Sequence, residues 1–239
     1  LVHHQQDGLH TVSAGDQIAF ADDRDFSTLG TARVVRVAHP DSRSAVYTLD
    51  QEIDLRDGRT VAMRWDHETD VHIAGCRARG NRARGFLIST LGRVVIEDNL
   101  LHTPGSAIQC CCDASSWYES GPVHELTVRR NRFEDCLYGV WGRALIAVNP
   151  VLDPSTAGPA VNKNIRVIDN AIVTSDPRLV YARSLEGFEF TGNKLQASST
   201  YPHDQRGPIF DVDANVHPRI LQPVDSFETH FCEPESFHL

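Results

Sequence analysis

The sequence predicts an all-β protein, a right-handed parallel β-helix with a small antiparallel β-barrel inserted near its amino end. Two patterns carry this prediction. Short runs of alternating apolar and polar residues, separated by turn residues, fill the first quarter of the chain, and a repeat of about 23 residues begins near residue 71. The β-branched alternation and the lack of a sustained 3.6-residue period exclude a helical solenoid.

Charge and composition exclude several classes of partner. The 239 residues carry a formal net charge of -9, with 23 Lys and Arg. Nucleic-acid binding draws its affinity from clustered cations, so no nucleic-acid partner is expected. No apolar run approaches the roughly 18 to 20 residues that a membrane span needs. The 6 cysteines have no zinc-site spacing, and most of them read as small buried apolar residues. We expect no metal and no cofactor.

The amino-terminal part divides into two expected segments. Residues 1–10 read as a strand of a β-helix coil followed by a turn. Residues 11–65 contain strand-like runs at 17–20, 31–37, 46–49 and 60–65, separated by Gly and Pro turn signals, which predicts a small barrel. The chain starts with neither an initiator Met nor a signal-peptide pattern, so we expect a fragment of a longer protein.

Residues 66–200 are expected to form the β-helix coils. In each unit an alternating strand is followed two residues later by Asn, or once by Cys, at positions Cys76, Asn99, Asn131, Asn170 and Asn193. Asn side chains at a fixed corner can stack as a ladder and satisfy the turn backbone. A second strand follows in most units, at 85–88, 106–109, 143–148 and 179–182. The sequence therefore predicts two strands and one Asn corner in each coil.

Two neighbouring coils carry extra residues, at 113–122 and roughly 149–164, directly after the second strand. Insertions at one location in neighbouring coils project from the same edge of a solenoid and can wall a cleft. Residues 201–239 are rich in Pro, His and Asp and read as an irregular carboxy-terminal cap, which a solenoid needs at its exposed end.

The first insertion holds the best candidates for chemistry. Asp113 and Glu119 are six residues apart on one loop. Hydrolysis of a glycosidic bond needs two carboxyl groups, held roughly 5 to 10 Å apart according to stereochemistry. Trp117 and Tyr118 lie between them and offer flat apolar faces to a sugar ring. A solvated loop whose aromatic residues cover the core is the alternative interpretation.

Three further residues are candidates for sugar binding. Asn81 and Arg84 belong to a polar turn one coil before the acidic loop, and Trp141 lies one coil after it. The planar guanidinium of Arg84 can hold a hydroxyl group or orient a carboxylate, and Trp141 can floor the same cleft. A surface turn and a core indole are the alternatives. The sequence has no Walker-type phosphate loop, no G-x-S-x-G elbow and no H-E-x-x-H motif.

A combination of elements points to a known family. The elements are NRARGFLIST at 81–90, VIEDN at 95–99, Gly105 to Ile108, Asp113 with WYESG at 117–121, and NRFEDC at 131–136 with Trp141-Gly142. Together they resemble glycoside hydrolase family 110, over about residues 1–195. That family comprises exo-acting bacterial α-1,3-galactosidases, including those that remove the terminal galactose of the blood group B antigen.

The resemblance implies a β-helix interrupted by small barrel modules and an inverting mechanism without a metal. It implies that Asp113 and Glu119 lie in the cleft and that Asp7 lies in an acidic strand before the barrel, where Gln6 stands in place of a second acid. We expect Asp113 and Asp7 to share the acid and base roles, unassigned between them. The substrate would be a glycan with terminal α-galactose, the amino-terminal coils would be missing, and the protein would be secreted or periplasmic.

Two other functions remain open. A non-catalytic glycan-binding β-helix, or an inactive fragment, predicts saturable binding without release of product. A polysaccharide lyase is the third possibility, although it needs a cationic base and usually calcium, which the excess of negative charge and the presence of only Lys163 and Lys194 as lysines disfavour.

Overall fold

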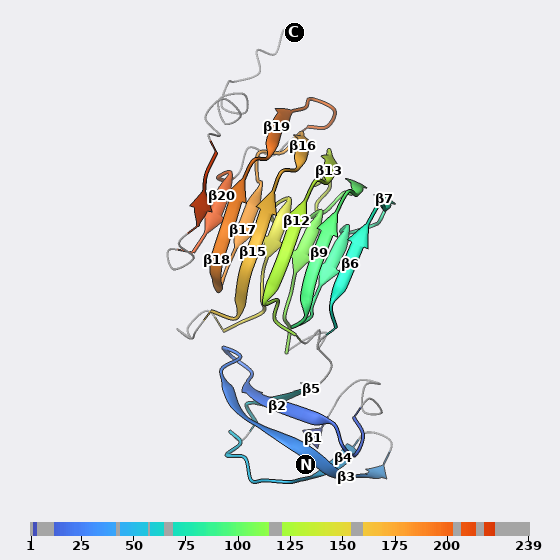
Figure 1. Ribbon diagram of the computed structural model, residues 1–239, viewed down its shortest axis with the longest axis vertical. Helices are drawn as coiled ribbons and strands as arrows, with labels where there is room; N and C mark the ends of the chain where they lie inside the picture. The colour runs from blue at the N-terminus through green and yellow to red at the C-terminus, as the bar shows by residue number, and fades with distance from the viewer. Residues whose placement is uncertain are drawn as a thin grey trace. The chain divides into compact units, whose positions relative to one another are not determined.

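The computed structural model describes residues 2–3, 12–41, 44–56, 58–64, 69–114, 121–153, 160–202, 207–213 and 218–222. Over these residues the regular structure consists of β-strands, numbered β1 to β21 along the chain (Figure 1). The chain forms two compact units. Unit 1 comprises residues 1–68, 114–117 and 152–159, and unit 2 comprises the remainder. In the described ranges, no helix is long and apolar enough to cross a membrane.

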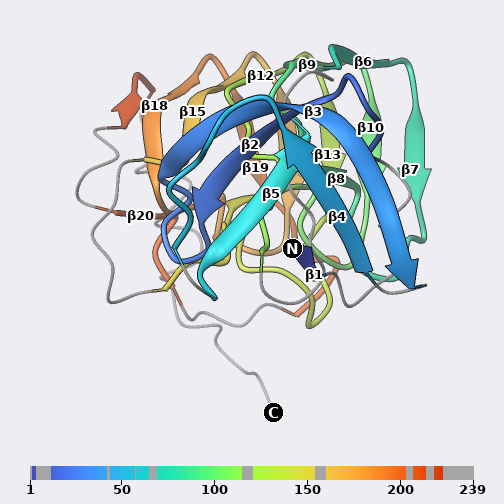
Figure 2. The same ribbon diagram turned by 90° about the horizontal axis from the view of Figure 1, so that it is seen from below.

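Unit 1 contains a five-stranded antiparallel sheet in the order β1-β4-β3-β2-β5 (Figure 2). Its strands are β1 (Val2–His3), β2 (Gln17–Asp22), β3 (Thr28–Asp41), β4 (Ser44–Leu49) and β5 (Thr60–Arg64). Ile18, Phe20, Ala32 and Val34 bury one face of the sheet. The pairing of β3 with β4 shifts register twice, and such irregularities bend a sheet. The small antiparallel module predicted from the turn spacing is therefore confirmed.

The position of β1 differs from the expectation that residues 1–10 form a β-helix strand. Val2 and His3 pair antiparallel with Ala45 and Ser44 of β4, so this strand extends the sheet of unit 1. Residues 1–10 lack the Asn that marks the corner after each repeated strand. The local sequence had no signal that would place the strand in a coil.

Unit 2 is a parallel β-helix, as predicted, and every coil passes through three parallel sheets (Figure 1). The first sheet contains β6 (Val71–Ala74), β9 (Arg93–Glu97), β12 (Glu125–Arg129), β15 (Asn162–Ile168), β18 (Leu185–Thr191) and β21 (Arg219–Ile220). The second contains β7 (Arg77–Arg79), β10 (Leu100–His102), β13 (Arg132–Glu134), β16 (Ala171–Thr174) and β19 (Lys194–Ala197). The third contains β8 (Phe86–Ile88), β11 (Ile108–Cys110), β14 (Ile146–Val148), β17 (Val180–Ala182) and β20 (Phe210–Val212).

Inward-facing side chains from successive coils stack in register to form the core of the β-helix. Val94, Leu126 and Ile165 make one such row in the first sheet, and all three are fully buried. Ile108 and Ile146 belong to a matching row in the third sheet. Since every strand alternates inward and outward positions, the polar residues between these apolar ones face away from the core.

The corner between the first and second sheets carries the predicted Asn ladder. The side-chain oxygen of Asn131 accepts hydrogen bonds from the backbone nitrogen of Asn99 at 3.1 Å and from its amide at 2.9 Å. Asn170 and Asn193 repeat this arrangement, and the backbone nitrogen of Cys76 donates to Asn99 at 2.8 Å. The ladder satisfies buried turn backbone and aligns the coils.

The corner between the third and first sheets carries the two insertions. Strands β11 and β14 pair in parallel, with Cys110 opposite Val148, and Asp113 forms a further parallel bridge with Val151. The insertions therefore begin side by side on neighbouring coils. This confirms the prediction that they leave the solenoid at one edge.

Candidate functional site

Asp113 lies at the start of the first insertion, three residues beyond the end of β11. The residue is 2% exposed, and carboxylates are seldom buried unless they are paired or hydrogen-bonded. The backbone nitrogen of Val151 donates to the carbonyl of Cys112 at 2.8 Å, which extends the pairing of β11 with β14 up to this residue. The fold thus places a buried carboxyl group at the point where two insertions begin.

Gly121 fixes the returning end of the same insertion. The Ser89 hydroxyl, just after β8, donates to the carbonyl of Gly121 at 3.4 Å. Gly121 has a φ of +112°, and a Cβ there would lie 3.1 Å from the Ser89 carbonyl oxygen. This close approach in a left-handed conformation requires glycine. Both ends of the insertion are therefore anchored to the third-sheet edge of the β-helix.

The cysteines that precede Asp113 do not supply a nucleophile. Burial raises the pKa of the Cys110 thiol to about 12, and burial likewise raises the pKa of Cys112 to about 12. Only the thiolate is an effective nucleophile or metal ligand. These residues pack as small apolar groups, as the sequence predicted.

The remaining cleft candidates of the sequence analysis fall outside the described residues. They are Asp7, Trp117, Tyr118 and Glu119.

Asn81, Arg84 and Trp141 lie together at a different corner, where the second sheet passes into the third. The amide of Asn81 donates to the Arg84 carbonyl at 3.0 Å, which closes the turn before β8. A Cβ on Gly105 would meet the carbonyl oxygens of Ala83 and Trp141, so the turns of three successive coils stack closely there. The Trp141 side chain is 53% exposed and is therefore not a core indole.

This corner and Asp113 stand at opposite ends of the third-sheet strands. Phe86 pairs with Ile108, so Arg84 is level with Ser106, and Asp113 lies seven residues farther along the strand direction. At roughly 3.3 Å per residue this is a separation of about 20 Å. The structure does not bring Arg84 or Trp141 next to Asp113.

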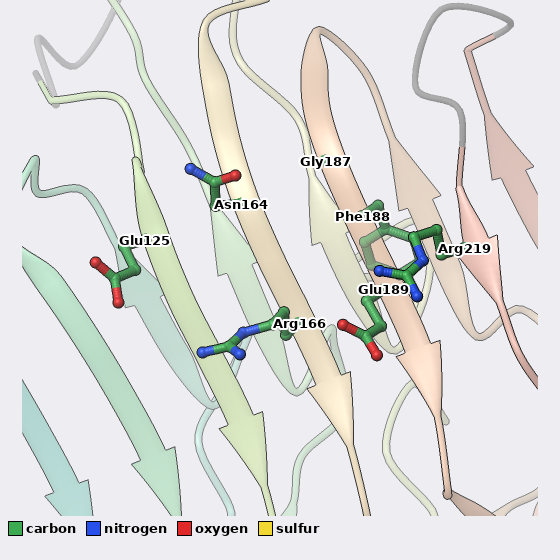
Figure 3. A pocket seen from close by; sticks show the side chains of 7 residues that line it. All are labelled: Glu125, Asn164, Arg166, Gly187, Phe188, Glu189 and Arg219. Atoms are coloured by element: carbon green, nitrogen blue, oxygen red, sulfur yellow. The ribbon is translucent and has the colours of Figure 1, made fainter.

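Sequence reasoning missed a hollow of about 390 Å³ on the outer face of the first sheet. Its lining residues are Glu125, Asn164, Arg166, Gly187, Phe188, Glu189 and Arg219 (Figure 3). The charged ones occupy outward positions of β12, β15, β18 and β21. The sequence did contain a signal for this hollow, because charged residues at outward positions of successive repeats lie side by side once the coils are stacked in register.

Within the described residues, no group of three or more His, Cys, Asp or Glu side chains is arranged to bind a metal ion. The acidic segment at residues 22–25 illustrates the reason. The carboxylate of Asp22 is fully buried and accepts hydrogen bonds from Arg24, at 3.0 Å, and from Arg56. These guanidinium groups, Arg24 foremost, hold the pKa of Asp22 well below its usual range. Its charge is already neutralised by protein groups.

A parallel β-helix joined to a small antiparallel barrel defines a class of repetitive all-β proteins whose binding sites lie along the coil edges. Residues 1–56 match the family described as GLAA-B beta-barrel domain II. The chain is 33% identical over 205 residues to alpha-1,3-galactosidase A of Bacteroides fragilis, a match that covers 84% of this chain and 34% of the relative.

Two further relatives carry related names. Alpha-1,3-galactosidase A of Shewanella woodyi is 30% identical over 207 residues, covering 84% of this chain and 33% of the relative. Alpha-1,3-galactosidase B of Bacteroides thetaiotaomicron is 35% identical over 149 residues, covering 61% and 24%. The chain thus spans about a third of the length of the first relatives. The chain belongs to glycoside hydrolase family 110, as the resemblance in its sequence elements indicates.

Proposed function

We propose that this chain forms part of an exo-acting α-galactosidase, which releases terminal α-1,3-linked galactose from glycans by inversion at the anomeric carbon. Support comes from relatives named alpha-1,3-galactosidase that align over most of the chain. The structural observation that carries the proposal is Asp113, a carboxyl group that is 2% exposed at the shared base of two insertions.

In this proposal Asp113 and Asp7 supply the two carboxyl groups of the inverting mechanism. One protonates the glycosidic oxygen and the other activates a water molecule on the opposite face of the sugar, as an inverting mechanism requires. Glu119 acts as their partner or accepts a hydrogen bond from a sugar hydroxyl group. Trp117 and Tyr118 supply apolar faces for the ring.

Burial suits Asp113 to this role, because a reacting carboxyl group in a site closed to bulk water has stronger electrostatic contacts with its surroundings. On the basis of the family resemblance we also propose that the protein is secreted or periplasmic. Cell fractionation of the source organism tests this location.

The test is the rate of galactose release from a synthetic terminal α-1,3-galactoside by the wild-type chain and by Asp113→Asn. Loss of a general acid or base lowers the rate by about 10²- to 10⁴-fold. The matched control is Asp98→Asn, because Asp98 is an exposed residue with a φ of +56° that Asn tolerates well. Thermal unfolding of both variants checks that they remain folded.

Undiminished release by Asp113→Asn would remove this residue from catalysis. Saturable binding of the galactoside by the wild-type chain with no release at all would instead support a non-catalytic glycan-binding β-helix or an inactive fragment. The anomer that appears first, followed by proton NMR, tests inversion, because an inverting enzyme produces β-galactose.

A further inference from the structure

The hollow on the outer face of the first sheet brings together charged side chains that do not pair with one another. Elsewhere on that face Glu97 is fully engaged, since it accepts from Arg129 at 2.6 Å, Arg130 at 2.7 Å and His72 at 2.9 Å. Within the part of the chain that the structure describes, the side chains of Glu125, Glu189 and Arg219 have no hydrogen-bond or ion-pair partner.

This lack of pairing is unexpected from the register. Arg166, Glu189 and Arg219 face one another on adjacent strands, where opposite charges commonly pair. Arg166 instead donates to the Thr127 hydroxyl at 3.0 Å on its other side. In Figure 3 the side chains of Glu125, Arg166 and Glu189 stand apart around open space. Their hydrogen-bonding capacity is available to a ligand.

Two left-handed residues keep the hollow open. Asn164 has a φ of +50° and Gly187 a φ of +77°, and they occupy the same level of β15 and β18, between the paired positions. A Cβ on Gly187 would lie 3.1 Å from the side-chain oxygen of Asn164. Because Gly187 has no side chain, space remains between Glu125 and the row formed by Arg166 and Glu189.

The lining chemistry selects a class of ligand. Two carboxylates and two guanidinium groups cancel in charge, so neither an anion nor a cation gains net attraction. Sugar hydroxyl groups both donate and accept, and therefore satisfy carboxylates and guanidinium groups at the same time. A volume of about 390 Å³ lies in the range of small-molecule sites. We propose that this hollow is a binding site for a neutral saccharide on the outer face of the first sheet.

Binding of a saccharide in the hollow does not require hydrolytic activity. Only the choice of a galactoside as the probe rests on the proposed function. Amide chemical shifts of the ¹⁵N-labelled chain are followed by NMR during titration with methyl α-galactoside and, separately, with galacturonate. The expected result is saturable shifts at Gly187 and Glu189 with the neutral glycoside and weaker binding of the uronate.

Glu189→Gln removes a charged acceptor while preserving shape and should weaken binding by about tenfold or more. Glu186→Gln is the matched control, because Glu186 is exposed on the same strand but does not line the hollow. Unchanged affinity in Glu189→Gln, an equal loss in Glu186→Gln, tighter binding of galacturonate, or no shift at Gly187 would each overturn the proposal.

The two proposals fail separately. Asp113→Asn is expected to lower galactose release by about 10²- to 10⁴-fold and leave the shifts at Gly187 intact. Glu189→Gln is expected to move those shifts to about tenfold higher sugar concentration and leave release from a small galactoside unchanged. Loss of the Gly187 shifts in Asp113→Asn would show that the galactoside binds only at the Asp113 corner, and would refute the separate site.

Discussion

Replacement of Asn131 by Ala tests whether the Asn ladder supports the coils that carry the insertions. The amide of Asn131 is 2% exposed and donates to the carbonyls of Ile96 at 2.8 Å and Arg129 at 3.0 Å. It also donates to Asn170 at 3.0 Å, and its oxygen accepts from Asn99 twice. The substitution removes all of these hydrogen bonds at once.

The cost follows from the groups left behind. In this buried corner the backbone nitrogen of Asn99 loses its acceptor, and the side-chain amide of Asn99 keeps only its hydrogen bond to the Ile73 carbonyl, at 2.9 Å. Each buried unsatisfied polar group costs about 1 to 3 kcal/mol, so we expect Asn131→Ala to lower the free energy of unfolding by about 3 to 5 kcal/mol. This places the variant at the severe end of single substitutions.

The measurement is urea unfolding followed by circular dichroism, with wild type and variant compared at equal slope. Asn81→Ala is the control, because the exposed Asn81 bonds only the local carbonyls of Arg84 and Gly85, and its loss should cost less than about 1 kcal/mol. A loss for Asn131→Ala no larger than that for Asn81→Ala would refute the account of the ladder.

Two further predictions concern ionisable groups. Hydrogen bonds to the carboxylate of Glu97, that from Arg129 foremost, lower the pKa of Glu97 to about 2. The contribution of Glu97 to stability is therefore complete above its unfolded pKa of about 4.3 and disappears as pH falls towards 2. The Tm difference between wild type and Glu97→Gln should vanish over that window, and a constant difference would contradict this. Iodoacetamide should label the exposed Cys76 in the native protein and spare Cys110 and Cys136, because burial raises the pKa values of these two thiols to about 12 and about 11. Mass spectrometry follows the labelling, and early labelling of Cys110 or Cys136 would contradict this prediction.

The sequence was sufficient to predict the parallel β-helix and its Asn corners, because the first-sheet strands alternate over five or more residues in most coils. It did not reveal the second sheet. Strands β7, β10 and β13 are only three residues long and follow the corner directly. Only the middle residue of each points into the core, and these residues are Ala78, Leu101 and Phe133. One apolar residue is too little for a period to be recognised.

The candidate site shows a second limit of sequence reasoning. Repeat number gives the height of a residue along a solenoid, but its position around the coil depends on the register between strands. Arg84 and Trp141 were assigned to the same cleft as Asp113 because their coils are adjacent. The alignment of Phe86 with Ile108 places them at the other end of the strands. The strands predicted at 85–88 and 106–109 already put Arg84 before one strand and Asp113 after the equivalent one, but only the register shows that these strands are aligned.

The separation also constrains how substrate can be bound. An exo-acting hydrolase places one terminal sugar at its carboxyl groups, and a corner about 20 Å from Asp113 cannot contact that sugar. If Asn81, Arg84 and the half-exposed Trp141 bind glycan, they bind a part remote from the scissile bond. Under the proposed function, the contacts that recognise terminal galactose therefore come from residues closer to Asp113 than this corner is.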